Sequence, residues 1–387
     1  MTGSMYAAVA GLKAHMTALN VIGNNVSNVN TLGYKTTRYT FNEALYTTNR
    51  SGSDGSVQAG GRNPAQIGFG ANIGTIDLDM SSKNYTPTGK ALDTMIDGDG
   101  FFIVGDKSTG IGDTAISAND TPTLKGMNLT RLGNFTIDPN GYLVDGNGSV
   151  VWGFLERSLS SEELTEYNAA DADISNLHNI VRNDANEITS ATITVPALTA
   201  FRLPMTEEVT TGTPPDETTT KVVRWPSFTA ATEGDSTADP PVPARGPQMD
   251  DAEGANVARL EADTVSINEK TGAITIMTSD EQLLVVGYLA IAKVTNPDGV
   301  THVDGRYYQA LEGAGEVRLT AIKSALEGVG IESAGDTKLV TGGLESSGTD
   351  LATEITNMIT VQRGYQANTR IVTVTDSMLE ELVNMKR

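Results

Sequence analysis

Apolar residues near the N-terminus recur with the spacing of a helix that buries one side. The spacing is 4-3-4-3-7, a heptad stripe interrupted only at Gly23, and its members are Met5, Val9, Leu12, Met16, Leu19 and Val26. Alanines at positions 7, 8, 10, 14 and 18 add helix propensity and allow a neighbouring element to approach closely. The pattern therefore predicts an N-terminal helix that packs against a partner.

A second heptad pattern fills the C-terminal segment. Apolar residues recur every seven positions at Leu344, Leu351, Met358, Tyr365, Val372 and Leu379. The residues that widen this stripe are Ile355, Ile371, Met378, Val383 and Met385. Thr349 or Asp350 is suited to cap a helix that begins at Leu351. A helix from Leu351 to Met385 would be about 52 Å long at 1.5 Å per residue. That length suits a coiled coil better than a compact domain.

The middle of the chain has the alternation and turns of β structure. Short alternating stretches occupy residues 74–80, 129–154 and 264–277, and the second contains the turn sequences DPNG at 138–141 and DGNG at 145–148. Residues 204–247 differ, because they hold eight of the chain's 14 prolines together with many threonines and acidic residues. This segment is expected to be either a loop-rich inserted domain or partly disordered.

These patterns predict a multidomain fold, with long coiled-coil helices at both termini and a mainly β middle. The domains are expected to be nested, each formed by N- and C-terminal segments together. The expected parts are a terminal coiled-coil domain (1–30 and 345–387), a connecting stretch (31–70), a β-rich middle domain (71–155 and 262–344) and an inserted outer domain (156–261).

Charge and composition exclude several function classes. The 27 Lys and Arg residues stand against 48 Asp and Glu, for a net charge of −21, so nucleic acid and anionic membranes are disfavoured as partners. The chain has no cysteine, which excludes disulfides and thiol chemistry. No apolar run approaches the ~20 residues of a membrane span. Lys13, His15 and Asn20 interrupt the apolar core that a cleavable signal peptide requires.

Catalytic and metal-binding patterns are weak, so neither an enzyme nor a cofactor is expected. The three histidines, His15, His178 and His302, are far apart and show no metal-ligand spacing, and a packing role is favoured for His15. The DPNG and DGNG sequences resemble parts of calcium loops but lack the remaining spaced ligands, so tight turns are favoured over calcium sites. An ordinary intramolecular helical hairpin is an alternative to the coiled coil, because periodicity alone does not separate them.

Three stretches resemble the flagellar rod and hook axial proteins. The first is AAVAGLKAHMTALNVIGNNVSNVNTLGYK at 7–35, the second comprises TGKALDTMIDGDGFFIV at 88–104 and LTRLGNFTIDPNGYLVDGNG at 129–148, and the third covers 342–386. The resemblance extends over roughly residues 3–155 and 262–387 and leaves an inner segment of domain size unmatched. This insertion favours the hook over the distal rod, whose proteins lack a large insertion.

The resemblance implies a structural subunit that polymerises into a curved, flexible helical tube. The tube would transmit motor torque from rod to filament as a universal joint, outside the cell, after export without a cleaved signal peptide. The expected partners are other copies of the chain, the rod, the hook cap, the hook–filament junction proteins and the export apparatus. A distal rod protein is one alternative, and a β-rich surface adhesin or tail-fibre-like protein on coiled-coil stalks is another.

The residues expected to pack between subunits are those of the two stripes, together with two asparagines. From the N-terminal segment they are Met5, Val9, Leu12, Met16, Leu19, Asn24, Asn25 and Val26, and from the C-terminal segment Leu351, Ile355, Met358, Tyr365, Val372 and Leu379. Asparagine is a mediocre helix former, so Asn24 and Asn25 are expected to fix the register of packing by hydrogen bonding, because a buried amide penalises slipped pairings. Some of the neighbouring asparagines would equally serve as caps and turns.

Overall fold

A computed structural model of the chain describes most of its residues. The described ranges are 2–54, 60–106, 127–168, 174–211, 218–225, 228–229, 248–249, 257–259, 265–277, 283–322, 326 and 331–385. The chain divides into two compact units. Unit 1 comprises Met1–Met80 and Ser347–Arg387, and unit 2 comprises Ser81–Ser346.

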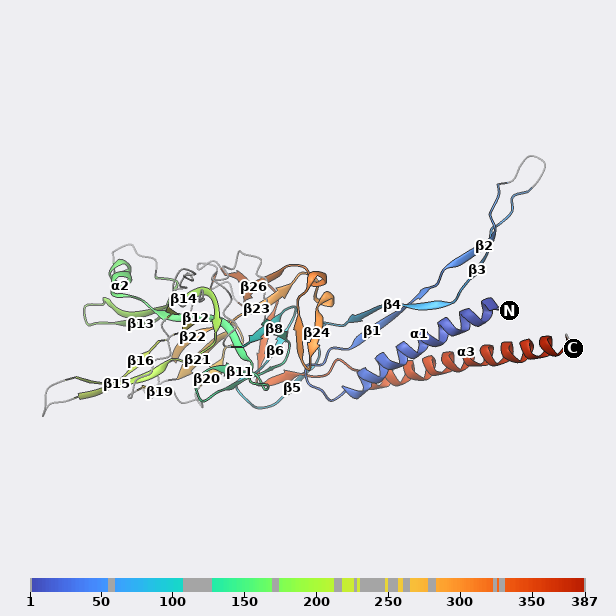
Figure 1. The fold of residues 1–387 in the computed structure, drawn as a ribbon. Coiled ribbons are helices and arrows are strands. Elements are labelled where there is room, and N and C mark those ends of the chain that lie inside the picture. Colours follow the sequence, from blue (N-terminus) through green and yellow to red (C-terminus); the bar gives the residue numbers. More distant parts are fainter. Residues whose placement is uncertain are drawn as a thin grey trace, which may run out of the picture. The chain divides into compact units, whose positions relative to one another are not determined.

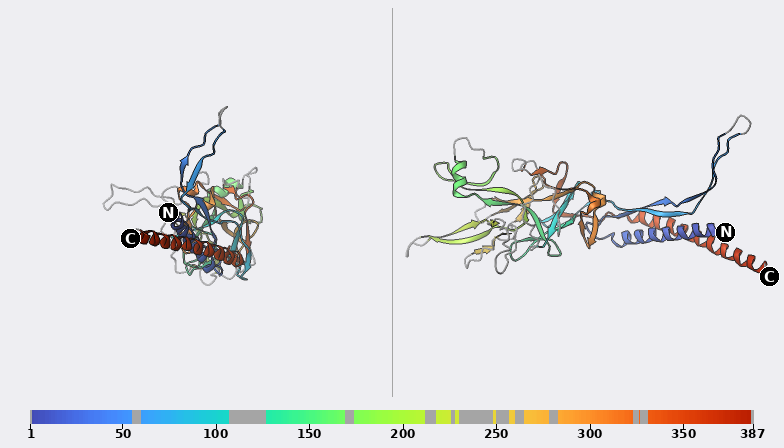
Figure 2. Two further views of the ribbon diagram at one scale, coloured as in Figure 1. Left: turned by 90° about the vertical axis from the view of Figure 1, so that its right-hand side faces the viewer. Right: turned by 45° about the horizontal axis from the view of Figure 1, so that its top comes forward.

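Unit 1 consists of two helices and two β-ribbons. Its elements are α1 (Thr2–Ser27), β1 (Thr37–Glu43), β2 (Tyr46–Arg50), β3 (Ala65–Gly68), β4 (Ala71–Leu78) and α3 (Leu351–Met385). The helices α1 and α3 run side by side, and strands β1 and β4 form an antiparallel ribbon that contacts α1 (Figure 1). Strands β2 and β3 extend this ribbon past Gly70, which has a positive φ of 104° and packs against the backbone of Ala7 (Figure 2).

The ends of both helices follow from local chemistry. Asp350 precedes the first residue of α3, and its carboxylate accepts hydrogen bonds from the amide of Ala352 (3.1 Å) and the hydroxyl of Thr353 (2.6 Å). This confirms the capping role that was open to Thr349 or Asp350 and lowers the pKa of Asp350 through these hydrogen bonds. The helix α1 ends at Ser27, and Gly33 adopts a left-handed φ of 72° in the turn that follows.

Unit 2 is mainly β, as expected for the middle of the chain. Among the described residues its largest sheet has 15 strands, with the central order β20-β21-β22-β12-β7-β23-β26-β27. The strands are β7 (Phe101–Gly105), β8 (Met127–Thr130), β10 (Thr136–Ile137), β11 (Leu143–Val144), β12 (Val150–Ser158), β13 (Leu177–Arg182), β14 (Ile188–Ala200), β20 (Val265–Ile267), β21 (Ala273–Met277), β22 (Leu283–Leu289), β23 (Ile291–Val294), β24 (Thr301–Asp304), β25 (Tyr307–Gln309), β26 (Val317–Ala321) and β27 (Glu332–Ser333).

Smaller sheets complete unit 2. They are formed by β5 (Tyr85–Pro87) with β29 (Gly343–Glu345), by β6 (Asp93–Asp97) with β9 (Gly133–Asn134) and β28 (Lys338–Thr341), by β15 (Met205–Thr211) with β16 (Thr218–Arg224) and β19 (Val257–Arg259), and by β17 (Phe228–Thr229) with β18 (Gln248–Met249). The core lies between the main sheet and the β6 sheet, with fully buried residues such as Phe102, Leu155 and Phe201. The expected separation of an inserted domain at 156–261 stays a prediction, and much of 204–247 lies outside the described residues.

The sequences DPNG and DGNG form two turns of the same construction. The carboxylate oxygen Oδ1 of Asp138 accepts hydrogen bonds from the amides of Asn140 and Tyr142, at 2.9 and 2.7 Å. Asp145 makes the same pair of bonds to Asn147 and Ser149, at 2.9 and 3.0 Å. Because the carboxylates hold their own loops in this way, both sequences form the tight turns that were favoured over calcium loops.

A short helix, α2 (Ser161–Tyr167), follows β12 and is fixed at its start by a capping box. Ser160 accepts a hydrogen bond from the amide of Glu163, and the Glu163 carboxylate accepts one from the Ser160 amide at 2.8 Å. Arg157, near the end of β12, adds two further hydrogen bonds to the Glu163 carboxylate at 2.9 and 2.6 Å. No helix in the described part of the chain is both long and apolar enough to cross a membrane.

The ion pair at Glu163 predicts an acid-sensitive start of α2. Hydrogen bonds from Arg157 and Ser160 lower the pKa of Glu163 to about 2, so its stabilisation is complete above the ordinary glutamate range and is lost as the pH falls toward 2. Glu163→Gln keeps a capping-box side chain but removes the charge. We expect this substitution to lower the stability of the α2 segment at pH 7 by only about 1 kcal/mol, because the ion pair is partly exposed. Hydrogen exchange of the α2 amides should show this difference at pH 7 and not at pH 2, with Glu162→Gln as the control.

Candidate functional site

The two helices of unit 1 meet along a seam of small side chains. Ala14, Ala18 and Ile22 of α1 are buried, and the buried residues of α3 are Val361 and Thr375. Ala18, Ile22 and Val361 form one apolar cluster, against which Leu19, Val26, Tyr39, Ile73 and Met358 pack. Alanine at the contact lets the helix backbones approach closely, so large side chains are not needed to fill the seam.

A reciprocal pair of glycines brings the helices still closer. A Cβ atom added to Gly11 of α1 would lie 2.8 Å from the Asn368 side chain of α3. A Cβ atom added to Gly364 of α3 would lie 2.7 Å from the His15 ring of α1. Each helix therefore receives a polar side chain of the other at a position without a side chain. The His15 ring also packs edge-on against Phe41, with ring centroids 5.5 Å apart, which agrees with its expected packing role.

Asn25 lies at the junction of α1, β1 and α3, and its side-chain amide is fully used. The Nδ2 group donates to the carbonyl of Thr37 (2.9 Å) and to the carboxylate of Glu354 (3.0 Å). The Oδ1 atom accepts from the Thr37 amide (3.0 Å) and from the Tyr34 hydroxyl (3.1 Å). Both donor hydrogens and both acceptor positions of the amide are occupied, which offsets the cost of its burial at 1% exposure.

Further hydrogen bonds join the two chain ends around Asn25. The hydroxyl of Thr349 donates to the carbonyl of Asn25 at 3.1 Å, and the hydroxyl of Ser347 donates to the carbonyl of Asn28 at 2.8 Å. The amide of Gly348 donates to the carbonyl of Tyr34 at 2.9 Å. Burial, with an added contribution from the Glu354 charge, raises the pKa of the Tyr34 hydroxyl, so this junction keeps a neutral phenol.

The structure places the expected packing residues in three different environments. Leu19, Val26 and Met358 join the apolar cluster of the seam, and Met5, Leu12, Val372 and Leu379 are half-buried. The exposed residues are Val9, Met16, Leu351, Ile355, Tyr365 and Asn24, with Val9 and Met16 exposed to 37% and 52%. Asn25, in contrast, is buried and bonded within its own chain. Ala14 and Ala18, which were expected to let a neighbour approach closely, lie in the seam. Gly11 and Gly364, which also make the seam, were not among the expected residues.

Helix geometry explains why the α1 stripe is not the seam. Val9 precedes the buried Ala18 by nine residues, which is two and a half turns at 3.6 residues per turn, so the two side chains point to opposite sides. Met16 lies two residues after Ala14 and is likewise turned away from it. Val9 and Met16 therefore face away from α3, while Leu19 and Val26, further along the same stripe, pack against the seam cluster.

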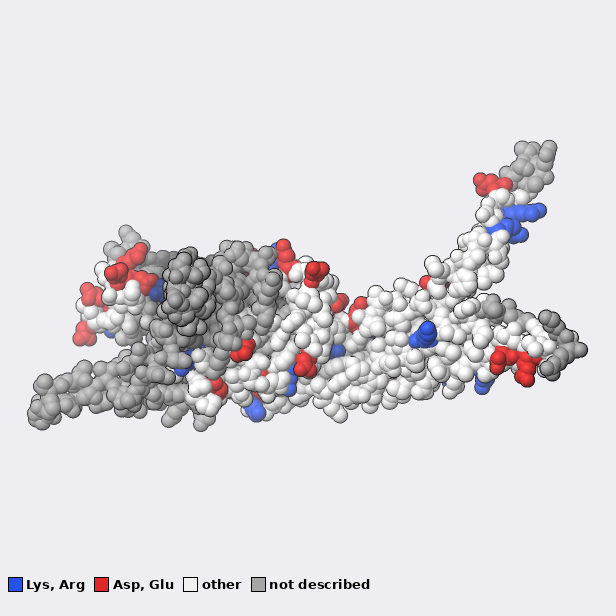
Figure 3. All heavy atoms as spheres, viewed as in Figure 1, with Lys and Arg blue, Asp and Glu red and all other residues white. Residues whose placement is uncertain are grey.

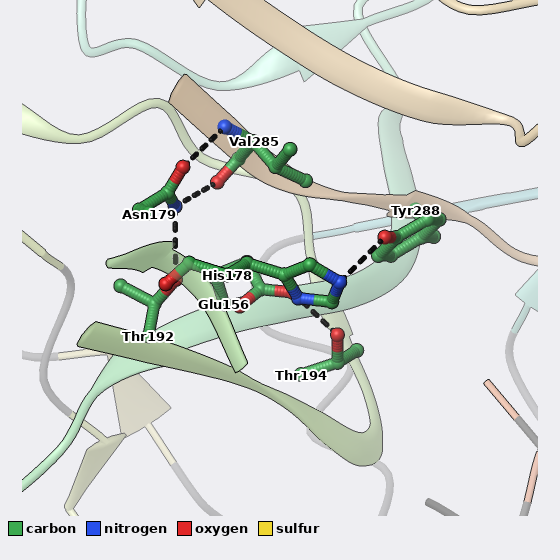
Figure 4. A network of polar contacts seen from close by, with 7 residues as sticks. All are labelled: Glu156, His178, Asn179, Thr192, Thr194, Val285 and Tyr288. Atoms are coloured by element: carbon green, nitrogen blue, oxygen red, sulfur yellow. Dashed lines mark hydrogen bonds and ion pairs between the residues drawn. The ribbon is translucent and has the colours of Figure 1, made fainter. Parts of the chain in front are cut away.

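A second polar cluster lies inside unit 2 and contains His178 (Figure 4). Glu156 of β12 is fully buried, and its Oε1 atom accepts a hydrogen bond from Thr194 and lies 3.1 Å from Nδ1 of His178. The other ring nitrogen of His178 lies 3.2 Å from the hydroxyl of Tyr288. Asn179 connects β13 to β22 through two hydrogen bonds with the backbone of Val285, both 2.8 Å long.

The order carboxylate, imidazole and hydroxyl is shared with nucleophilic triads, but the hydroxyl here is not activated. Burial first, and the Glu156 charge second, raise the pKa of Tyr288 to about 12. An activated nucleophile needs the opposite shift or an accessible position, and Tyr288 is only 5% exposed. The cluster instead fastens β13 and β22 to β12 in the interior of unit 2. No group of three or more acidic or histidine side chains that could hold a metal occurs among the described residues.

Comparison with known proteins gives a consistent picture for both ends of the chain. Residues 5–35 match the family model described as "Flagella basal body rod protein". Residues 340–385 match the model described as "Flagellar basal body rod FlgEFG protein C-terminal". Both matched segments include parts of the helices that form the seam.

Relatives extend the similarity over the full length. The chain is 28% identical over 387 residues to the flagellar basal-body rod protein FlgG of Bacillus subtilis, with 100% of both chains covered. It is 25% identical over 476 residues to the flagellar hook protein FlgE of Borreliella burgdorferi, again with 100% of both covered. The flagellar hook protein FlgE2 of Helicobacter pylori, a solved structure, shows 12% identity and a TM-score of 0.31, covering 67% of this chain and 100% of that one.

The filled amide of Asn25 predicts a large effect of a single substitution. Asn25→Leu would remove the acceptor of both the Thr37 amide and the Tyr34 hydroxyl, and we expect unit 1 to lose about 3 kcal/mol of stability. Asn24→Leu is the matched control, because Asn24 is exposed and its change should stay within about 1 kcal/mol. Hydrogen exchange of the α1 and α3 amides measures the stability loss of each variant. Equal effects of the two substitutions would contradict the role given to Asn25.

The raised pKa of Tyr288 predicts sensitivity of unit 2 to alkali. The folded state favours the neutral phenol, so the stabilisation is complete below pH 10 and is lost as the pH rises from 10 to about 12. A shift of two units corresponds to about 3 kcal/mol at 1.36 kcal/mol per unit. Chemical denaturation should show the difference in free energy of unfolding between wild type and Tyr288→Phe shrinking by about 3 kcal/mol between pH 10 and pH 12. A difference that stays constant with pH would contradict the assignment.

Proposed function

Since this chain belongs to the family of flagellar rod and hook axial proteins, we propose that it is the structural subunit of the flagellar hook. In this role it polymerises into a curved, flexible helical tube that transmits motor torque from the rod to the filament. Its partners are other copies of itself, the rod, the hook cap and the hook–filament junction proteins. The subunit reaches the cell exterior through the flagellar export apparatus without a cleaved signal peptide.

The exposed stripe of α1 is the observation that carries this proposal. The helix already has a partner in α3, yet Val9 and Met16 remain exposed on its other side. An aliphatic stripe on a helix that is already paired indicates a further partner, because monomeric proteins rarely leave such rows in water. In a polymer, neighbouring copies supply that partner, and the helix pair becomes part of a larger coiled coil. Unit 1 would then form the inner layer of the tube.

The surfaces of the two units indicate different roles in the tube. Unit 1 exposes aliphatic side chains along both helices, whereas unit 2 holds most of the chain's excess of acidic residues. We therefore assign the fixed contacts of the tube to unit 1. Unit 2, as middle and outer domains nested between the terminal helices, makes the polar contacts that slide when the tube bends. Polar contacts that are bridged by water can be broken and re-formed at a lower cost in free energy than packed apolar contacts.

The distal rod is the second candidate, because a full-length relative is named a rod protein. Length does not decide between the two, since full-length alignments exist with the rod relative over 387 positions and with the hook relative of Borreliella burgdorferi over 476. The tube itself distinguishes the candidates, since a hook is curved and flexible and a rod is straight. Electron microscopy of tubes grown from the purified protein at high concentration tests this: curved tubes support the hook, and straight ones would assign the chain to the rod.

Assembly should depend on the exposed apolar residues of α3. Leu351 is 43% exposed at the start of the helix, so Leu351→Asp should leave both units folded and abolish tube formation. Thr360→Asp, which places the same charge at an exposed polar position of α3, is the control and should assemble. Circular dichroism checks folding, and sedimentation with electron microscopy checks assembly. Normal tubes from Leu351→Asp would remove this part of α3 from the packing surface.

A further inference from the structure

The register of the helix pair leaves the end of α3 without a counterpart. Three contacts define an antiparallel register: Asn25 with Glu354, His15 with Gly364, and Gly11 with Asn368. Each step back along α1 corresponds to one step forward along α3. At this register Thr2, the first described residue of α1, stands opposite Ser377, so residues 378–385 extend beyond the described part of α1. Figure 2 shows the end of α3 projecting past the start of α1.

The projecting end belongs to an apolar row along one side of α3. Ile371, Val374, Met378, Leu382 and Met385 follow each other at helical spacings of three or four residues. All five are exposed, with Met378 at 51% and Met385 at 76%. A second exposed row, Leu351, Ile355 and Ile359, occupies the first turns. At 100° per residue the two rows lie on different sides of the helix, on either side of the seam with α1.

The outward part of the α1 stripe and the C-terminal row of α3 are comparable in length. Leu19 packs in the seam cluster, so the outward part runs from Met5 to Met16 and covers 11 residue steps, about 17 Å at 1.5 Å per residue. The row from Ile371 to Met385 covers 14 steps, about 21 Å. Within one chain the two surfaces do not meet, because Val9 and Met16 face away from α3. Two surfaces of comparable length and like chemistry can therefore pair between copies.

Charge at the edges of the two surfaces is complementary. Lys13 is the only charged residue of α1 apart from the titratable His15, and it borders the stripe next to Val9 and Met16 on the helical wheel. Residues 371–385 carry Asp376, Glu380 and Glu381 and no basic residue, before a basic pair at 386 and 387. Acidic side chains gather near this end of α3 in Figure 3. Glu381 borders the apolar row, where a lysine from another copy would meet it.

From these features we infer that the outward stripe of α1 in one copy packs on the C-terminal row of α3 in the next. The contact uses two different surfaces, so it is heterologous, and repetition gives an open helical polymer rather than a closed dimer. Lys13 of one copy and Glu381 of the next pair at its edge. The inference rests on the proposed function and specifies which surfaces of the subunit meet in the tube.

Two complementary variants test this contact. The first, Val9→Asp with Met16→Asp, removes the α1 stripe, and the second, Val374→Asp with Met378→Asp, removes the α3 row. Each alone should stay monomeric in analytical ultracentrifugation. Mixed in equal amounts, they should form a heterodimer and stop there, because one intact stripe meets one intact row. Asn20→Asp and Gln366→Asp, at other exposed positions of the same helices, are the controls and should form tubes.

The outcomes separate this inference from the proposed function. A mixture that stays monomeric while the wild type forms curved tubes would overturn the contact and leave the hook assignment intact. Dimers of the second variant alone would indicate a two-fold contact between α1 stripes and would also overturn it. A heterodimer from the mixture, without curved tubes from the wild type, would support the contact and contradict the hook. Lys13→Glu should weaken assembly at least tenfold in critical concentration, and Glu381→Lys should restore it.

Discussion

The buried amide of Asn25 is the constraint on which the arrangement of unit 1 depends. An amide taken out of water must have its donors and acceptors filled, and here the partners come from the α1–β1 connection, from β1 and from α3. A shift of α3 by one residue would remove Glu354 from reach and leave a donor unpaired. This side chain, together with the bonds of Ser347 and Thr349, fixes the register of two helices separated by more than 300 residues. The glycine contacts at Gly11 and Gly364 then follow at the same register.

This register decides which residues are available for other molecules. Alanine, glycine and polar side chains make much of the seam, so it uses only part of the aliphatic surface of either helix. Val9 and Met16 of the α1 stripe are left exposed, as are the two aliphatic rows of α3. In a single chain these rows would be a liability, since exposed apolar rows promote association. In a subunit that polymerises, burial of the same rows between copies drives assembly. The seam leaves these rows exposed within one copy.

Periodicity predicted the elements well and their partners poorly. The long C-terminal helix begins and ends at the expected residues, Leu351 and Met385, because a sustained heptad and an Asp cap are local signals. The face that meets α1 was not found, because the aliphatic stripe gives a stronger signal than a row of small and polar residues. Ala14, Ala18 and Asn25 recur at helical spacing, and Glu354, Val361, Asn368 and Thr375 recur every seven residues. That pattern marks a close contact but is common in helices without one. The partners of Glu156 and Asn25 lie far along the sequence, so no local pattern reveals them.

Directional assembly requires that the two ends of a subunit differ, and unequal helix lengths provide that difference. The helix α1 has 26 residues and α3 has 35, and their register is pinned near Asn25, where α1 ends and α3 begins. Nearly all of the excess length must therefore appear at the opposite end, as an apolar projection with acidic residues beyond the described part of α1. Had the register been free to slide, part of the excess would be hidden by pairing, and the projection would vary between copies. A single satisfied amide thus gives every subunit an identical projecting end, which a regular helical polymer needs.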